Sequence, residues 1–393
     1  MTPAARYAAA IDVLDAILSG AVAERAITQW ARSNRFAGSK DRAAIRDHVF
    51  DVLRAKRSLS AIGDAQTARG MILGLLRRDG IAPETVFGAG DYGPSALTDA
   101  ESRAPNVDIN AQTAEMCDLP DWLWPDWQES LGDQAVAAAR IQQRRAGIFL
   151  RVNLRKTDVE AARIALAEDG ISTHVVPEVK TCLQVTENER RILQSHAYLN
   201  GWVELQDTAS QMAMLALNVP QDARVLDYCA GGGGKALALA DIYGACVTAH
   251  DSDPRRMGDL DARAKRAGVT IVQRNTDALS KEPPFDVVLC DAPCSGSGTW
   301  RRTPEAKWGL TSDKLHYYNE LQREILAKCA SLTTSTGVLA YATCSVLRAE
   351  NDEITAQFLS NHPDWRSRSV LRLYPTELHD GFYLNVFTPK NTR

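Results

Sequence analysis

The stretch that decides the fold is Phe285-Asp-Val-Val-Leu-Cys-Asp-Ala-Pro-Cys-Ser-Gly-Ser-Gly298, together with Tyr341-Ala-Thr-Cys-Ser345. Each is an apolar run that ends in a tight polar turn holding a cysteine, Cys294 in the first and Cys344 in the second. If both runs are strands of one parallel sheet, both thiols lie at the carboxyl ends of strands, where open α/β sheets bind their ligands. Two thiols and the carboxylate of Asp291 at one sheet edge indicate covalent chemistry.

The sequence around this stretch alternates between strand and helix patterns. Short apolar runs at 224–229, 246–250, 269–273 and 337–342 are separated by helical patterns. Repeated strand–helix units predict an α/β domain with a doubly wound, mostly parallel sheet over residues 201–393. The alternating run at 381–387 predicts one further strand, which sheets of this kind often add in the antiparallel direction.

The first part of the chain has a different character. Ala8, Ile11, Leu14 and Leu18 recur at helical spacing, and no strand pattern interrupts residues 1–85, so we predict an all-helical domain over residues 1–140. Residues 86–110 are rich in Gly, Ser and Pro and predict an irregular connection. Strand patterns at 148–152 and 171–176 flank a helical pattern, which predicts a small α+β module over residues 145–200.

Composition limits the classes of protein. A chain of 393 residues is too long for one ordinary core, and 45% hydrophobic with 24% charged residues is typical of a globular protein. No apolar run approaches the roughly 18 residues of a membrane span, and the charged N-terminus is unlike a secretory signal, so we expect a cytoplasmic protein without a membrane partner. The eight cysteines are scattered without a Cys-x-x-Cys pair, so no metal site is expected.

Charge alone does not identify a partner. The net charge of −4 argues weakly against a polyanion, because phosphate binding is driven by Lys and Arg. Local clusters such as Arg155-Lys156 and Arg301-Arg302 could nevertheless form a basic face. Solvated surface charges are an equally good interpretation of these clusters.

A glycine loop, Cys229-Ala-Gly-Gly-Gly-Gly-Lys235, lies between a predicted strand and a predicted helix, where a ligand can approach the backbone. It is not a phosphate-binding P-loop, because Ala236 follows Lys235. The next two strands end near Asp251 and Asp277, which suit a ribose and an adenine amino group. The three features together favour S-adenosylmethionine, since nothing nearby selects a pyrophosphate. The alternative is that both acids only cap the following helices.

The two cysteines suit methylation of a pyrimidine at carbon 5. A thiolate that adds to carbon 6 makes carbon 5 nucleophilic toward the methyl group of a sulfonium. A second thiol near carbon 5 could assist the elimination that frees the product. An acid beside ring nitrogen 3 of cytosine would stabilise the adduct, a role open to Asp291. For each cysteine alone, the competing interpretation is a buried structural thiol.

These segments resemble the RNA cytosine-C5 methyltransferases of the Sun/Fmu/RsmB family. Asp291–Gly298 with Arg301-Arg302 and Pro304-Glu-Ala-Lys-Trp308 resembles the family's motif IV, and Tyr341–Leu347 with Glu350-Asn351 resembles its motif VI. The glycine loop resembles motif I, usually Cys-Ala-Ala-Pro-Gly-Gly-Lys-Thr, with Gly232 in place of the proline and Ala236 in place of the threonine.

The resemblance extends beyond these motifs. Asp207 and Ser210 match a Gln-Asp-x-x-Ser segment that precedes the family's catalytic domain. Asn153–Thr157 resembles the start of its small RNA-binding module, and the helices of residues 1–140 resemble the NusB-like domain of its rRNA subgroup.

The resemblance implies an enzyme that forms 5-methylcytosine in 16S rRNA through a covalent adduct. Cys344 corresponds to the nucleophile, Cys294 to the cysteine that helps to release product, and Asp291 to a residue that orients cytosine and cofactor. The residues expected to contact S-adenosylmethionine are Cys229, Ala230, Gly231, Gly232, Gly233, Gly234, Lys235, Asp251, Asp277 and Asp291. Those expected to contact RNA are Arg301, Arg302, Lys307, Arg155 and Lys156.

Two alternatives remain open at this point: the same chemistry on tRNA, and an RNA-binding ribosome-assembly protein without catalysis. Both cysteines and the strand-end acids count against the second. A monomer is expected.

Overall fold

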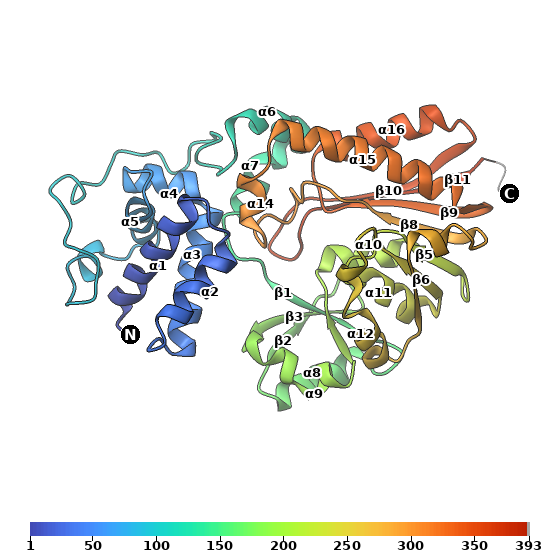
Figure 1. The fold of residues 1–393 in the computed structure, drawn as a ribbon, viewed down its shortest axis with the longest axis horizontal. Coiled ribbons are helices and arrows are strands. Elements are labelled where there is room, and N and C mark those ends of the chain that lie inside the picture. Colours follow the sequence, from blue (N-terminus) through green and yellow to red (C-terminus); the bar gives the residue numbers. More distant parts are fainter. Residues whose placement is uncertain (391–393) are drawn as a thin grey trace. The chain divides into compact units, whose positions relative to one another are not determined.

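The computed structural model describes residues 1–390 (Figure 1). They form two compact units. The first, called here the helical unit, contains residues 1–128, 132–145 and 300–309; the second, the sheet unit, contains 129–131, 146–299 and the chain from 310 onward. Within residues 1–390, no helix combines the length and the apolar character that crossing a membrane requires.

The core of the helical unit is formed by the helices α1 (Pro3–Leu18), α2 (Ala23–Ser33), α3 (Ser39–Arg54), α4 (Lys56–Gly63) and α5 (Ala68–Arg78). Of the predicted stripe, Leu14 is buried, whereas Leu18 at the end of α1 is 39% exposed. Helices α4 and α5 contact each other through their backbones, because a Cβ atom on Gly74 would lie 2.0 Å from the carbonyl oxygen of Leu59. The helical prediction for this region is confirmed.

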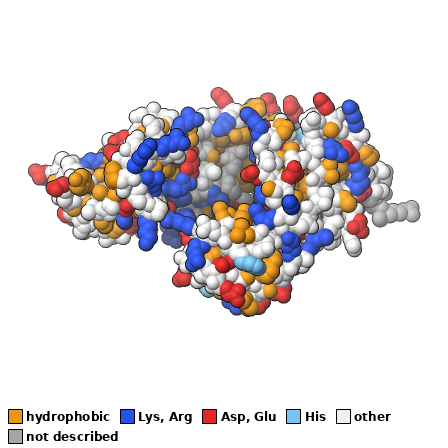
Figure 2. Space-filling model, turned by 60° about the horizontal axis from the view of Figure 1, so that its bottom comes forward, with side chains coloured by type: hydrophobic (Ala, Val, Ile, Leu, Met, Phe, Trp, Pro, Cys, Tyr) orange, Lys and Arg blue, Asp and Glu red, His pale blue; other side chains and the backbone are white. Residues whose placement is uncertain are grey.

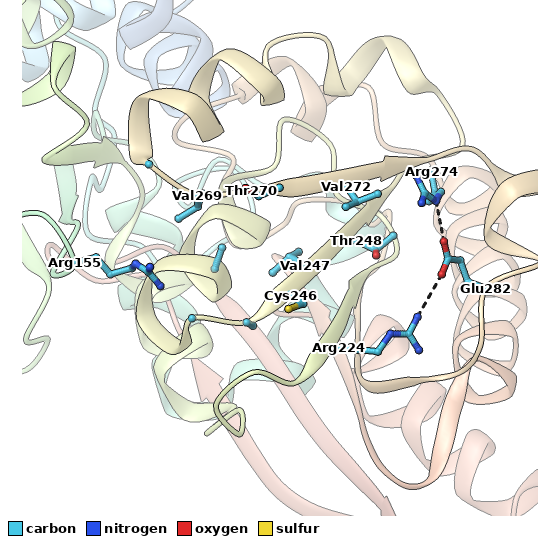
Figure 3. Close-up of a pocket in the computed structure, with 14 residues that line it drawn as sticks. Arg155, Arg224, Cys246, Val247, Thr248, Val269, Thr270, Val272, Arg274 and Glu282 are labelled. Atoms are coloured by element: carbon cyan, nitrogen blue, oxygen red, sulfur yellow. Dashed lines mark hydrogen bonds and ion pairs between the residues drawn. The ribbon is translucent and has the colours of Figure 1, made fainter.

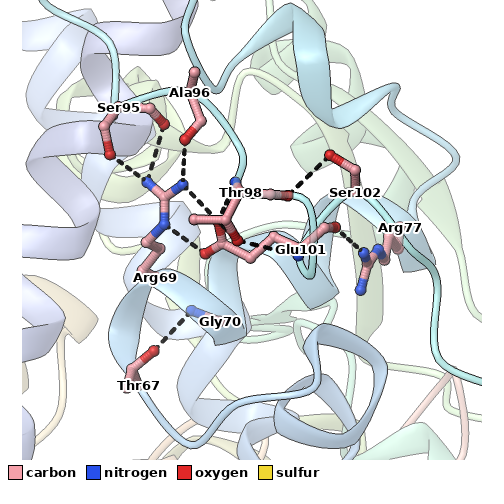
Figure 4. A network of polar contacts seen from close by, with 9 residues as sticks. All are labelled: Thr67, Arg69, Gly70, Arg77, Ser95, Ala96, Thr98, Glu101 and Ser102. Atoms are coloured by element: carbon pink, nitrogen blue, oxygen red, sulfur yellow. Dashed lines mark hydrogen bonds and ion pairs between the residues drawn. The ribbon is translucent and has the colours of Figure 1, made fainter.

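The connection between α5 and the later helices has no helix or strand in residues 86–110, as its composition predicts. A polar network nevertheless holds it in place (Figure 4). The Nε atom of Arg69 donates to Glu101 at 2.7 Å, and its Nη atoms donate to the carbonyls of Ser95 and Ala96 at 3.1 and 3.0 Å. The hydrogen bonds from Arg69 lower the pKa of Glu101 to about 2. These charged contacts add to the apolar ones of Val86 and Phe87, which belong to the core of the helical unit.

The helical unit also takes in short elements from elsewhere in the chain. They are η1 (Pro83–Thr85), η2 (Asp121–Leu123), α6 (Trp124–Leu131), η3 (Gly132–Gln134), α7 (Ala135–Ile141) and α14 (Pro304–Trp308). Trp127 is fully buried and stacks on Trp300, with ring centroids 6.0 Å apart. Segment 300–309 thus packs within the helical unit although it follows the Cys294 turn in sequence.

The sheet unit begins with the predicted α+β module, a sheet of order β2-β3-β1-β4. Its elements are β1 (Ile148–Val152), α8 (Val159–Glu168), β2 (Ser172–Val175), β3 (Cys182–Glu187), η4 (Glu189–Gln194), α9 (His196–Leu199) and β4 (Val203–Leu205). Strand β4 pairs with β1 on the side opposite β3, so that β1 has a paired strand on both sides. The module therefore extends beyond residue 200, where the sequence predicts its end.

The larger sheet has seven strands within the described residues, in the order β10-β11-β9-β8-β5-β6-β7. The strands β5 (Arg224–Asp227), β6 (Cys246–His250), β7 (Ile271–Arg274), β8 (Phe285–Asp291) and β9 (Thr333–Thr343) are parallel. The antiparallel strands are β10 (Trp365–Leu373) and β11 (Phe382–Pro389). The prediction of a mostly parallel, doubly wound sheet is confirmed, whereas strand β10 is an addition that the sequence analysis missed.

Helices cover both faces of this sheet (Figure 1). One apolar cluster joins Val287 and Leu289 of β8 to α10 (Thr208–Ala216), α11 (Gly234–Tyr243) and α12 (Leu260–Ala267). A second joins Val288 and Cys290 to α13 (Thr276–Leu279), α15 (Ser312–Ser331) and α16 (Asp352–Asn361). Successive residues of β8 therefore face opposite helical layers. Two short helical turns complete this unit: η5 (Pro254–Met257) precedes α12, and η6 (Arg348–Glu350) precedes α16.

Candidate active site

A cavity of about 570 Å³ lies at the carboxyl ends of β5 and β8. There the strand order reverses, because β6 and β7 follow on one side of β5 and β8 on the other. Such switch points are where doubly wound sheets bind ligands. The lining residues include Cys229, Lys235, Asp291, Cys294 and Cys344. The structure therefore brings together the two thiols, the acid and the glycine loop.

The two thiols form one contact. Asp291 of β8 pairs in register with Ala342 of β9, so the turns that follow these strands lie side by side. The Sγ atoms of Cys294 and Cys344 are 3.4 Å apart. Thr299 donates a longer hydrogen bond to Cys344 at 3.9 Å.

The pair is electrostatically unequal. The hydrogen bond from Cys294 lowers the pKa of Cys344, against the opposing effect of burial, and Lys235 and Thr299 act in the same direction as that bond. The same hydrogen bond raises the pKa of Cys294 well above its usual value. These opposite directions favour Cys344 over Cys294 as the cysteine that loses its proton first, and a thiolate is the nucleophilic form of cysteine.

Asp291 is held by the lysine of the glycine loop. The Nζ atom of Lys235 donates to Oδ2 of Asp291 at 2.7 Å. Burial is the largest influence and lowers the pKa of Lys235, but the attraction and hydrogen bond of Asp291, together with Asp227 and Cys344, outweigh it and raise that pKa. The ammonium thus remains charged next to the carboxylate, which fixes the orientation of Asp291 in the cavity wall.

The Cys294 turn rests on a buried carboxylate. Glu350 is fully buried and accepts hydrogen bonds from the Ser295 amide at 2.7 Å and from Gln322 at 3.1 Å. Gln322 also donates to the carbonyl of Pro293 at 2.9 Å. Burial raises the pKa of Glu350, although these donors oppose the shift. The residues on both sides of Cys294 are therefore tied to one anchor.

The glycine loop adopts conformations that only glycine takes easily. Gly231 and Gly233 have φ angles of +52° and +78°, and a Cβ atom on Gly233 would lie 2.3 Å from a methyl carbon of Leu260. The amide of Gly231 donates to Oδ2 of Asp251 at 2.9 Å, which ties the loop to the end of β6.

Asp251 organises this loop. It is 2% exposed, accepts from the Asp253 amide at 2.9 Å and forms an ion pair with Arg256 at 3.1 Å. The side chain that caps the following helix belongs to Asp253. The alternative to a ribose contact was that Asp251 only caps the following helix. Asp253 caps that helix instead, and Asp251 holds the glycine loop.

Asp277 is not brought to the cavity. It is exposed in the first turn of α13, whose cap is Asn275, and it is absent from the lining. Gly233 and Asp251 also do not line the cavity, although Asp251 contacts the loop that does.

Two of the cations expected to contact RNA are buried in the helical unit. Lys307 is 2% exposed and donates to the Arg54 carbonyl at 2.9 Å, and burial lowers its pKa to about 8. Arg301 is 1% exposed, and its carbonyl accepts from Arg54 at 2.6 Å. We correct their expected role to packing, since a side chain closed off from solvent cannot meet a phosphate. Arg302 remains exposed.

Arg155 and Lys156 are exposed in the sheet unit. Lys156 donates to the carbonyls of Asn200 and Arg266. Arg155 reaches a cavity of about 490 Å³ along β6 and β7, where Glu282 bridges Arg224 and Arg274 (Figure 3). Because Glu282 already pairs with Arg224 and Arg274, this cavity is a weaker candidate for the active site than the cavity that contains the two thiols.

The sequence analysis missed other groups at the site. Gln206 lines the cavity and donates to the Gly234 carbonyl at 3.2 Å; its position next to Asp207 was the available signal. Tyr318 of α15 also lines the cavity, and no local pattern indicates it. Asp227 lies fully buried at the end of β5, and burial with the repulsion of Asp291 raises its pKa to about 7.

Comparison with known proteins adds independent information. The family model described as 16S rRNA methyltransferase RsmB/F matches residues 214–389, and the model described as RsmF/B-like, ferredoxin-like domain matches residues 119–190. The probable ribosomal RNA small subunit methyltransferase B of Bacillus subtilis is 32% identical over 255 residues, which are 63% of this chain and 57% of the relative. The protein of that name from Synechocystis is 30% identical over 314 residues, 72% of this chain and 70% of the relative.

Among solved structures, the crystal structure of PH0851 superposes with a TM-score of 0.76 over 99% of both chains at 23% identity, which shows a shared fold. The alignment with the Bacillus protein covers less than two thirds of that relative.

Proposed function

The chain belongs to the RsmB/F family of 16S rRNA methyltransferases, and we propose that it transfers a methyl group from S-adenosylmethionine to carbon 5 of a cytosine in small-subunit rRNA. The observation that carries this proposal is the pair of thiols 3.4 Å apart at the edge of a cavity that the glycine loop also lines. Methylation at carbon 5 needs a thiolate, whereas methylation of an exocyclic amine does not.

The cavity suits the methyl donor. Gly231, Gly232 and Gly234 expose backbone to it, and side chains at these positions would approach Arg256 and Arg263. We assign the loop 229–235 to holding the cofactor, with Asp251 keeping the loop in position. S-adenosylmethionine supplies an electrophilic methyl group on a positively charged sulfur. Asp291 contributes negative charge to the same wall.

The proposed reaction begins at Cys344. Its thiolate adds to carbon 6 of the cytosine, so that carbon 5 can attack the methyl group. Asp291, held by Lys235, orients the base by accepting from its amino group.

The release step falls to Cys294. Once Cys344 is bonded to carbon, it no longer accepts the proton of Cys294, and the main cause of the raised pKa of Cys294 is removed. Cys294 can then release its own proton to solvent and, as a thiolate, take the proton from carbon 5; the electron pair of that C–H bond re-forms the ring double bond, and the bond between carbon 6 and Cys344 breaks to return Cys344 as a thiolate.

The helical unit and the small module are proposed to bind the RNA, the former as a NusB-like domain. Figure 2 shows Lys and Arg side chains gathered on the visible face of the helical unit, and Arg302 and Arg46 are among the residues that line a cavity there. Basic surface of this kind supplies the sequence-independent part of RNA affinity.

The test is transfer of labelled methyl groups to 16S rRNA, assembled 30S subunits and tRNA, followed by bisulfite mapping of the modified position. We expect incorporation into 16S rRNA and only background incorporation by Cys344→Ala. Cys246→Ala is the matched control, because Cys246 is an exposed thiol that does not line the cavity. Full activity of Cys344→Ala would overturn the proposed mechanism. Incorporation of methyl groups into tRNA alone would overturn the assignment of small-subunit rRNA as the substrate.

A further inference from the structure

A second cavity, of about 570 Å³, lies on the helical unit and has no part in the chemistry described above. Its floor is the small-residue face of α1, formed by Ala5, Ala8 and Ala9. Its remaining walls include three aromatic side chains, Trp30 of α2, Phe36 and Tyr92. We call it the aromatic pocket.

Two of the three rings are largely exposed, whereas Trp30 is half-buried against the core of the helical unit. Phe36 is 74% exposed and Tyr92 is 80% exposed. Within residues 1–390, Trp30, Phe36 and Tyr92 make no ring–ring contact with one another or with other aromatic residues. Large apolar groups left in water around a cavity mark a binding surface rather than a core.

The backbone that carries these rings is held in place. Asn34 donates to the Trp30 carbonyl at 2.9 Å, and the Ala37 amide donates to the Asn34 carbonyl at 3.1 Å, so the turn before Phe36 is fixed. Gly93 packs against Ala4 of α1, where a Cβ atom on Gly93 would lie 3.2 Å from the Ala4 methyl group. Together with the Arg69 network, this contact holds the loop that carries Tyr92 (Figure 4).

The pocket also contains one carboxylate, Asp12. Burial, and then the repulsion of Asp15, raises its pKa above the usual value. In the described part of the chain no Lys or Arg forms an ion pair with Asp12. Its oxygens are therefore available to accept hydrogen bonds from a ligand.

Charged residues of both signs lie close in sequence to the pocket, and Asp91 is exposed next to Tyr92. Arg32, Arg35 and Lys40 are exposed and lie close in sequence to Trp30 and Phe36. The pocket offers aromatic rings and one hydrogen-bond acceptor, Asp12, and cations lie near it in sequence. These features fit a planar ligand group that carries N–H donors and is attached to an anionic chain.

We propose that the aromatic pocket binds an unpaired base of the substrate RNA, stacked against Phe36 and Tyr92, with an amino group of the base donating to Asp12. This inference rests on the proposed function and adds a substrate-recognition site to it. Base stacking on aromatic rings is a general means of binding single-stranded RNA. The acceptor favours cytosine, adenine or guanine over uracil, because uracil lacks an exocyclic amino group.

The test measures binding of the full-length chain to short single-stranded oligocytidylate and oligouridylate. We expect tighter binding of oligocytidylate, and a loss of about fivefold to a hundredfold in affinity on replacing Phe36 or Tyr92 by alanine. Asp12→Ala is expected to reduce this preference but not abolish it, because Asp291 in the active-site cavity can still accept from the amino group of cytosine. Ile109→Ala is the matched control, because Ile109 is 62% exposed on the same unit but lies outside the pocket.

Unchanged RNA affinity and unchanged preference for oligocytidylate in the double variant Phe36→Ala/Tyr92→Ala would overturn the inference. Binding of a protein segment, and not of RNA, in the pocket would also overturn it. The methylation assay separates this failure from failure of the proposed function. If the wild-type chain methylates 16S rRNA while the pocket variants bind RNA normally, only the pocket assignment falls. If the wild-type chain methylates no RNA, the proposed function falls.

Discussion

The Sγ atoms of Cys294 and Cys344 lie 3.4 Å apart although the residues are separated by 50 positions in the chain. They extend from the ends of the adjacent parallel strands β8 and β9. The contact lets one thiol hold a proton for the other, so that substitution of either cysteine is expected to change the ionisation of its neighbour.

The first prediction concerns Cys294→Ala. Removing the donor raises the pKa of Cys344, so alkylation of Cys344 by iodoacetamide should require a higher pH than in the wild type. Peptide-resolved mass spectrometry at a series of pH values measures this shift. Because product release is slowed, a covalent protein–RNA adduct should also accumulate on a denaturing gel.

Cys294→Ser is the control for this experiment, since its hydroxyl can still donate to Cys344. An alkylation profile of Cys294→Ala that coincides with the wild-type profile would contradict the shared hydrogen bond. Normal turnover without an adduct would remove the release role.

The second prediction concerns Glu350, a positioning residue. Glu350→Ala leaves the donors of Ser295 and Gln322 without their buried acceptor, which should cost about 2–4 kcal/mol of unfolding free energy. The turn that carries Cys294 should then be misplaced, so kcat falls while cofactor affinity stays near the wild-type value. Glu350→Gln retains an acceptor and should recover most of both losses. Equal behaviour of the two variants in urea unfolding and turnover would argue against the anchor.

The third prediction separates Asp251 from Asp277. Asp251→Ala removes the acceptor of the Gly231 amide, so cofactor affinity measured by calorimetry should fall roughly tenfold or more. Asp277→Ala should leave that affinity nearly unchanged, because Asp277 lies outside the lining of the cavity. A larger loss for Asp277→Ala than for Asp251→Ala would reverse this assignment.

The fourth prediction is the pH dependence of the Arg69–Glu101 network. The pKa of Glu101 is about 2 in the folded chain against 4.5 for the ordinary group, so the network stabilises the fold fully above about pH 4.5 and is lost as pH falls toward 2. Because both side chains are about a quarter exposed, Glu101→Gln should cost only about 1 kcal/mol at pH 7.

Thermal unfolding from pH 7 to pH 3 tests this prediction. The gap in melting temperature between Glu101→Gln and the wild type should narrow as the pH falls. A gap that stays constant over this range would contradict the assigned pKa.

Local sequence was sufficient for the parts of the fold that repeat a simple pattern. The apolar runs of β5, β6, β8 and β9 predict a parallel sheet, and the cysteine after each of the last two predicts their meeting at one edge. Strand β10 was missed because Arg366, Arg368 and Ser369 are exposed on it, so it lacks the apolar pattern of a covered strand. Its pairing with β11 is a tertiary contact that no local window contains.

The predictions that were wrong or missing for single side chains have the same cause, which is a tertiary contact. Lys307 looks like a surface cation in sequence, but its ammonium donates to a carbonyl 253 positions away. Tyr318 reaches the active-site cavity from a long helix whose pattern indicates only packing. Such contacts depend on which distant segments meet, and one sequence does not carry that information.

Segment 300–309 belongs to the helical unit although, in the sequence, it lies between two stretches of the sheet unit. The helical unit includes Trp300, buried against Trp127, and Lys307, bound to the end of α3, although both are encoded far downstream among the catalytic motifs. Removal of residues 1–145 alone would therefore leave segment 300–309 without the helices it packs against. A protein engineer faces this constraint: a fragment that begins at residue 146 would expose a tryptophan and a lysine that are covered in the whole chain.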